Sequence, residues 1–183
     1  MNTWSYTIMG NSEAGRIWFK FSGLIWSFLT DEEIETLKSI PHERIRLIIK
    51  ENIDNLVKIA IGLKSRLVYQ VLGVFLMEFG AKMTSALKEL ILIHSRWEDE
   101  RNQLFDEKDR AERFYYLSKF RKTIKSYKNG VRTIVSDETP SNVVEKLRLQ
   151  GLIDTNYPFI IPLSRPPIDH KISALPKIPS NER

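Results

Sequence analysis

The spacing of apolar residues divides the chain into regions with different patterns. Between residues 42 and 67, apolar side chains recur at steps of three and four, which places them on one side of an α-helix. This stripe consists of Ile45, Ile49, Ile53, Leu56, Ala60, Leu63 and Leu67. Residues 67–95 are apolar on nearly all sides, as in a helix at the centre of a bundle, and Gly73 and Gly80 are expected contact points or kinks within them.

The segment before residue 22 has a different pattern, in which aromatic and β-branched residues dominate two short runs. The runs TWSYTIM and RIWFKF flank GNSEAG, a segment with glycine at both ends that is typical of a turn. Because side chains alternate along a strand, Trp4 and Tyr6 share one face, and Phe19 and Phe21 share another. The pattern predicts a β-hairpin over residues 3–21, with one face packed on the helices or on another chain.

Several local signals predict where helices begin and end. Thr30 and Glu33 have the spacing of a capping box, in which each side chain accepts a hydrogen bond from the other residue's backbone NH. Pro41 is expected to open a helix, since proline is tolerated in a first turn. Residues 96–113 contain 12 charged residues of both signs, which indicates an exposed helical extension outside the core. The following helix is expected to end near Gly130.

The C-terminal part of the chain is rich in proline. Six of the eight prolines lie between Pro158 and Pro179, so neither a helix nor a central strand can persist there. Residues 141–163 have the order of the last helix and wing of a winged-helix module, but a surface helix followed by an arm explains them better, because that helix has few cations. The sequence therefore predicts a mainly α fold in three parts. These are an N-terminal β-hairpin region over residues 1–29 packed on the bundle, a helical bundle domain over residues 30–153 and an extended Pro-rich arm over residues 154–183.

Composition narrows the class of protein. The 183 residues include no cysteine, which excludes disulfides, thiolate nucleophiles and cysteine metal sites and favours a cytoplasmic location. The N-terminus has no signal-peptide pattern, and the most apolar stretch is shorter than the roughly 18 residues that a membrane span needs. The formal net charge of +5 favours an acidic partner such as nucleic acid, an anionic membrane or an acidic protein surface.

Motifs for catalysis and metal binding are missing from the sequence. It contains no phosphate-binding glycine loop and no GxSxG elbow. His94 and Glu98 lie four residues apart, but one such pair does not make a metal site, and a salt bridge or hydrogen bond on one helix face is the better interpretation. The acidic residues of 98–109 can in principle bind Mg²⁺, but arginines and lysines among them balance their charge as on a solvated face. We therefore expect no enzyme, no cofactor and no metal site.

The strongest functional signal is the stretch RFYYLSKFRKTIKSYKNGVR, residues 113–132. It has seven positive side chains, five aromatic rings and no acidic residue. On a helix, its apolar stripe faces the core and consists of Leu117, Phe120, Ile124, Tyr127 and Val131. A row of four cations runs parallel to this stripe, one residue on, and consists of Arg121, Lys125, Lys128 and Arg132. The candidate phosphate-binding residues of this helix are Lys119, Arg121, Lys122, Lys125, Lys128 and Arg132.

Two functions fit this pattern best. The leading hypothesis is a non-enzymatic helical subunit that binds the phosphate backbone of nucleic acid through the basic helix, within a nucleoprotein assembly. The alternative is a structural or adaptor protein that docks other chains through its hairpin and C-terminal arm, with the basic row facing an acidic protein surface. An enzyme fits less well, because no residues converge on a reacting centre, and a membrane-surface role fits least, since the apolar stripe is narrow. Either leading function implies an oligomer or a subunit of a complex.

Overall fold

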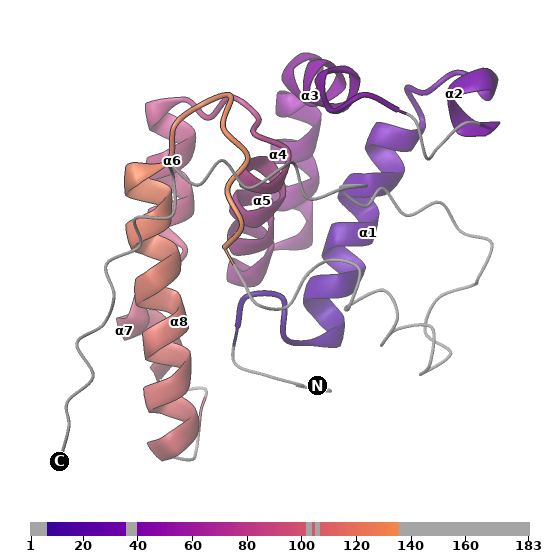
Figure 1. Ribbon diagram of the computed structural model, residues 1–183. Coiled ribbons are helices and arrows are strands. Elements are labelled where there is room, and N and C mark those ends of the chain that lie inside the picture. Colours follow the sequence, from indigo (N-terminus) through magenta and orange to yellow (C-terminus); the bar gives the residue numbers. More distant parts are fainter. Residues whose placement is uncertain (1–6, 36–39, 102–103, 105–106, 136–183) are drawn as a thin grey trace, which may run out of the picture.

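The computed structural model describes residues 7–35, 40–101, 104 and 107–135, and these residues fold as a helical bundle without strands (Figure 1). The helices are α1 (Ser12–Trp26), α2 (Asp31–Glu35), α3 (His42–Glu51), α4 (Ile53–Leu63), α5 (Arg66–Glu78), α6 (Ser85–Ile93), α7 (Trp97–Glu100) and α8 (Glu107–Ser126). Helix α5 packs on α1, α4 and α6, and α6 packs in turn on α8. Figure 1 shows α1 on one side of α5 and the pair α6 and α8 on the other. The predicted mainly α class is confirmed.

The predicted N-terminal β-hairpin is wrong, because residues 12–26 form helix α1. Asn11, which lies in the expected turn, caps this helix: its Oδ1 accepts a hydrogen bond from the backbone NH of Ala14 at 2.8 Å. The apolar residues that suggested the second strand also fit the spacing of a helix, and most of the first predicted strand lies outside the described residues. The buried side of α1 consists of Ala14, Ile17, Trp18, Phe21 and Ile25. The sequence of this segment fits both the two-residue repeat of a strand and the 3.6-residue repeat of a helix, and packing against α5 selects the helix.

Aromatic rings join α1 to α5 in the core. Trp18 meets Phe75 edge to face, with ring centroids 4.8 Å apart, and the ring of Phe21 lies 5.6 Å from that of Phe75. The ring of Phe79, the residue that follows α5, lies 4.9 Å from that of Phe75 and 6.2 Å from that of Trp18. A fully buried phenylalanine contributes about 1.5–3 kcal/mol of transfer free energy. Burial of these rings therefore outweighs the strand preference of an isolated aromatic run.

The apolar stripe of residues 45–67 continues through breaks between helices. Helix α3 ends at Glu51, and the side chain of Asn52 donates a hydrogen bond to the carbonyl oxygen of Ile48 at 3.0 Å. Asparagine competes in this way with helical hydrogen bonds and so favours helix ends. Lys64 ends α4 in the left-handed region, at a φ of 51°. The spacing of three and four is kept across each break, so the sequence pattern does not reveal the breaks.

The predicted capping box at the start of α2 is confirmed. The backbone NH of Glu33 donates to Oγ1 of Thr30 at 3.2 Å, and the NH of Thr30 donates to Oε2 of Glu33 at 2.9 Å. Arg44 of α3 donates to Oε1 of Glu33 at 2.7 Å, and this hydrogen bond lowers the pKa of the Glu33 carboxyl. Pro41 directly precedes the first residue of α3, as predicted.

Helix α5 lies at the centre of the bundle, as its apolar sequence predicts, and every residue from 68 to 80 is buried. At Gly73, an added Cβ would lie 2.9 Å from Cζ of Phe120 in α8, so the two helices approach closely there. The helix ends at Glu78, because Gly80 adopts a φ of 64°, and α6 begins only at Ser85. The expectation of a single helix through residue 95 is therefore wrong.

Helix α8 buries the first part of its predicted apolar stripe. Leu117, Phe120 and Ile124 expose 1% of their surface or less. The helix ends at Ser126, four residues before Gly130, which has a φ of 86°. The expected surface helix and the Pro-rich arm lie outside the described residues. Within the described part of the chain, no helix combines the length and apolar character needed to cross a membrane.

Candidate nucleic-acid interface

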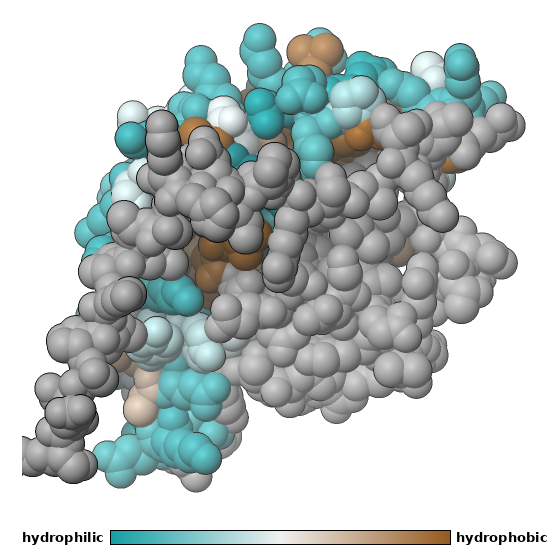
Figure 2. All heavy atoms as spheres, in the orientation of Figure 1, coloured by the Kyte–Doolittle hydropathy of each residue, from teal (hydrophilic) through white to brown (hydrophobic). Residues whose placement is uncertain are grey.

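Helix α8 is amphipathic, with its core side set by Leu117, Phe120 and Ile124. At 3.6 residues per turn, Lys122 lies opposite this core side, and Lys119 and Lys125 flank it one turn before and one turn after. We refer to Lys119, Lys122 and Lys125 as the lysine face. In Figure 2, hydrophilic side chains cover the lower end of α8, where the helix begins, and the upper edge of the molecule.

The lysine face has no acidic partner among the described residues. Lys122 and Lys125 are exposed, as is Lys128 just beyond the helix, and Lys119 is half-buried. No ion pair or side-chain hydrogen bond joins these four ammonium groups to another described residue. In the sequence, no acidic residue lies between Glu112 and Asp137. Four of the six predicted cations are therefore placed where a dissolved anion can reach them.

Arg121 is turned toward α6 instead of solvent. Its Nη1 donates hydrogen bonds to the carbonyl oxygens of Leu92 at 2.5 Å and Ser95 at 3.0 Å. These carbonyls lie at the C-terminal end of α6, where the last helical carbonyl groups have no partner within the helix. A cation is favoured at this end of a helix, so Arg121 joins α8 to α6.

Arg132 is likewise engaged within the fold. Its Nη2 lies 3.4 Å from Oε2 of Glu78, and the two side chains are 14% and 4% exposed. Burial raises the pKa of the Glu78 carboxyl, and the nearby positive charge of Arg132 offsets part of this rise. Arg132 thus holds the segment after α8 against the end of α5. In the predicted row of four cations, Lys125 and Lys128 are therefore exposed, whereas the two arginines bind groups of the protein itself.

Two aromatic rings lie beside the lysine face. Phe114 and Tyr115 are each 48% exposed, whereas Phe120, further along the helix, is fully buried. Tyr115 precedes Lys119 by four residues and Lys122 by seven, so all three lie along one side of the helix. Phe114 meets Trp97 of α7 edge to face, with centroids 5.4 Å apart. Phe114 and Tyr115 are not part of the predicted apolar stripe, and about half of each side chain is open to solvent.

The sequence predicted that residues 96–113 form an exposed extension outside the core. This prediction is wrong for part of the segment. Glu100 and Arg113 are buried, and Arg113 donates from Nε to Oε2 of Glu100 at 2.7 Å. Gln70, buried in the middle of α5, accepts from Nη2 of Arg113 at 2.7 Å and donates to Oε1 of Glu100. The signal that could have revealed this cluster is Gln70 itself, because a polar residue in an otherwise apolar run requires a buried partner.

His94 and Glu98 do not form the expected helical pair, because α6 ends at Ile93 and α7 begins at Trp97. The imidazole of His94 instead stacks on the ring of Tyr69, with centroids 3.9 Å apart and an interplanar angle of 8°. Burial lowers the pKa of His94, and the charge of Arg66 lowers it further. Across the described ranges, no group of three or more histidine, aspartate or glutamate side chains is arranged to hold a metal ion.

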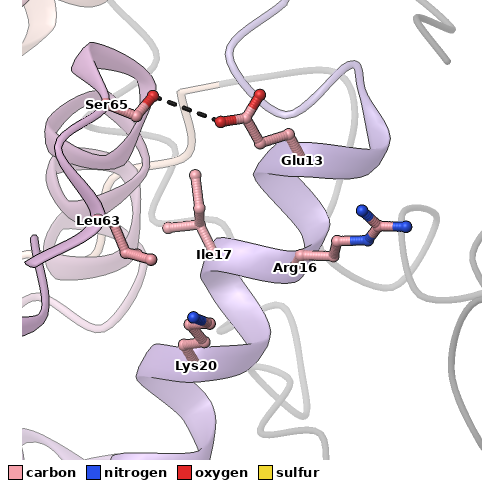
Figure 3. A pocket seen from close by; sticks show the side chains of 6 residues that line it. All are labelled: Glu13, Arg16, Ile17, Lys20, Leu63 and Ser65. Carbon is pink, nitrogen blue, oxygen red and sulfur yellow. Dashed lines mark hydrogen bonds between the residues drawn. The ribbon is translucent and has the colours of Figure 1, made fainter. Parts of the chain in front are cut away.

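A hollow between α1 and the junction of α4 and α5 has a volume of about 190 Å³ (Figure 3). Its lining consists of Glu13, Arg16, Ile17, Lys20, Leu63 and Ser65. The hydroxyl of Ser65 donates to Oε1 of Glu13 at 3.4 Å across it. Pockets for small molecules usually have at least about 300 Å³. The hollow therefore does not have the character of a substrate pocket.

Comparison with known proteins adds no relative. No family model, no curated protein and no solved structure matches this chain. The charge and geometry of the described residues are therefore the basis for inferring its function.

Proposed function

We propose that this protein is a non-enzymatic helical subunit that binds nucleic acid through the lysine face of α8, within a nucleoprotein assembly. The observation that carries the proposal is the placement of Lys122 and Lys125 on the solvent side of α8, with Lys119 beside them and no acidic partner among the described residues. Like charges three or four residues apart destabilise a helix slightly. A polyanion that follows the helix removes this repulsion.

The contacts are expected to be made to phosphate and not to base edges. Lysine ammonium groups at a spacing of about 5–6 Å along a helix present spaced point charges to a phosphate backbone. Bidentate contacts to adenine are made by asparagine or glutamine side chains, and helix α8 has neither. Asn129, just beyond α8, is occupied: its Oδ1 accepts from the backbone NH of Met83 at 2.8 Å. Arg121 is likewise bound to α6. Binding should therefore depend strongly on salt and weakly on base sequence.

A salt series with a double variant tests the proposal. Replacing Lys122 and Lys125 by alanine should lower the slope of log affinity against log salt by roughly 1.4–1.8, at about 0.7 per contact for a single strand and 0.9 for a duplex. The matched control replaces the exposed Lys50 of α3 and Lys58 of α4, which changes the net charge equally at another surface. The control should keep the slope of the unsubstituted protein.

Two outcomes would overturn the proposal. One is the absence of binding to any nucleic acid at low salt by folded protein. The other is an equal change of slope in the lysine-face variant and the control, which would mean that only net charge matters. A loss of binding to an acidic protein, without any effect on nucleic acid, would instead assign the lysine face to an adaptor role.

A further inference from the structure

We infer that the ligand of the lysine face is a single strand of nucleic acid, whose unstacked bases lie on the rings of Tyr115 and Phe114. This inference rests on the proposed function and specifies the strand state of the ligand. It combines two independent observations on one side of α8: a row of lysines without acidic partners, and two large aromatic side chains that are each 48% exposed.

The rings and the lysines lie in register along the helix. Tyr115, Lys119 and Lys122 are related by steps of four and three, and a step of four corresponds to a rise of about 6 Å. Lys125 continues the positive charge one turn further. A strand that follows α8 can therefore place phosphates at the lysines while a base next to them reaches the ring of Tyr115.

The exposed rings distinguish a single strand from a duplex. In a duplex, the faces of the bases are covered by their neighbours, and a protein that follows the outside meets phosphate and sugar. In a single strand, the base faces are accessible, and stacking on aromatic side chains supplies much of the affinity without requiring a particular sequence. Exposed aromatic rings beside a cationic row therefore match a single strand and are superfluous for a duplex.

Tyr115 is the better placed of the two rings. Its ring and that of Tyr116 are nearly perpendicular, with centroids 5.3 Å apart, and 48% of Tyr115 remains exposed. Phe114 makes a similar near-perpendicular contact with Trp97, at 5.4 Å between ring centroids. Each ring is thus oriented by an aromatic partner before the ligand arrives, which reduces the rotamer entropy lost on binding.

Binding can be measured by fluorescence anisotropy with three labelled probes of one mixed sequence: a 20-nucleotide DNA strand, the RNA strand of the same sequence and the corresponding DNA duplex. The protein should bind at least one single strand more tightly than the duplex. Replacing Tyr115 by alanine should weaken single-strand binding about five- to 150-fold, and should leave duplex binding within about twofold.

Two further variants distinguish stacking on an aromatic ring from a general apolar contact. Tyr115→Phe retains the ring and should bind like the unsubstituted protein, whereas Tyr115→Leu keeps an apolar side chain without a ring and should behave like Tyr115→Ala. The control is Phe28→Ala, which removes an aromatic side chain that is 44% exposed on the loop between α1 and α2. Circular dichroism should show that every variant keeps its helices.

The outcomes separate this inference from the proposed function. If no probe binds at low salt, the proposed function itself fails. If the duplex binds as tightly as both single strands, or if Tyr115→Leu binds single strands as well as Tyr115→Phe does, the stacking inference is overturned while phosphate binding stands. A preference between the DNA and RNA strands is compatible with the inference, and tighter binding of the RNA would add a contact to its 2′-hydroxyl groups.

Discussion

Arg113 of α8 donates a hydrogen bond from Nε to Oε2 of Glu100 in α7 at 2.7 Å, and both side chains are only 11% exposed. Nη2 of the same guanidinium donates to Gln70 of α5, and Nη1 donates to the carbonyl oxygen of Thr7 at 3.2 Å. One buried cation therefore joins two helices and the N-terminal segment to α8. Removing two charges from water is costly, and this arrangement is stable only because each polar group has a partner.

Replacing Arg113 by leucine should destabilise the fold strongly. The variant leaves the carboxylate of Glu100 buried without its cation, which typically costs about 3–5 kcal/mol. The free energy of unfolding, measured with urea, should fall by this amount. Arg16→Leu, at an exposed position of α1, is the matched control and should change it by less than about 0.5 kcal/mol.

A variant in which Glu100 and Arg113 are both replaced by leucine should lose less stability than Arg113→Leu alone, because no unpaired charge remains buried. Equal losses in the single and double variants would show that the charge of Glu100 is not what makes the single substitution costly.

Gly73→Ala should destabilise the protein by about 1–3 kcal/mol. The new methyl group would lie 2.9 Å from Cζ of Phe120 and 3.1 Å from Cδ1 of Ile124, so α5 and α8 would have to move apart. Gly23→Ala, in the interior of α1, meets no atom within 4 Å and should raise stability by about 0.5–1 kcal/mol through helix propensity. Thermal or urea unfolding of both variants measures the contrast, and a stabilised Gly73→Ala variant would contradict the close packing.

Arg121→Ala should act on stability more than on binding. Its hydrogen bonds to the carbonyls of Leu92 and Ser95 satisfy the end of α6, and their loss should cost about 1–2 kcal/mol. Lys122→Ala, at an exposed position of the same helix, should leave the free energy of unfolding nearly unchanged. Its effect should instead appear in the salt dependence of nucleic-acid binding. The reverse assignment of the two effects would mean that Arg121, and not Lys122, contacts the ligand.

His94 should make the stability of the fold depend on pH. Its pKa in the folded state is lowered from 6.5 by burial and by the charge of Arg66. The unfolded state therefore takes up a proton first as the pH falls, so stability is full above about pH 6.5 and declines as the pH falls through the lowered pKa. His94→Phe can keep the stacking on Tyr69 and removes the titration.

The test of this pH dependence compares the free energies of unfolding at about pH 5.5 and about pH 7.5. The loss on acidification should be smaller in His94→Phe than in the unsubstituted protein. A remaining loss is expected from His42, because burial and the charge of Arg132 also lower its pKa. If both proteins lose the same amount of stability, the depressed pKa of His94 is contradicted.

The sequence alone predicts the features that depend on neighbours along the chain. The capping box of Thr30 and Glu33 forms because the two residues meet within one helical turn. The burial of α5 follows from a run of residues that are apolar all around the helix. The buried stripe that includes Leu117 and Phe120 follows from the 3.6-residue period of the helix. The exposed positions of Lys122 and Lys125 follow from the same period, so these two members of the lysine face are readable from spacing.

Only the tertiary structure decides the rest, because it depends on contacts between residues far apart in the chain. The run around Trp18 fits a strand or a helix equally well, and the rings of Phe75 and Phe79 select the helix. Glu100 and Arg113 belong to a segment with the composition of a solvated face, and they become buried because Gln70 needs partners in the core. Arg121 stands in the same sequence row as Lys125, yet the end of α6 lies beside it and takes its hydrogen bonds. Charge and hydropathy belong to each residue by itself, whereas burial and pairing depend on which residues from other helices pack against it.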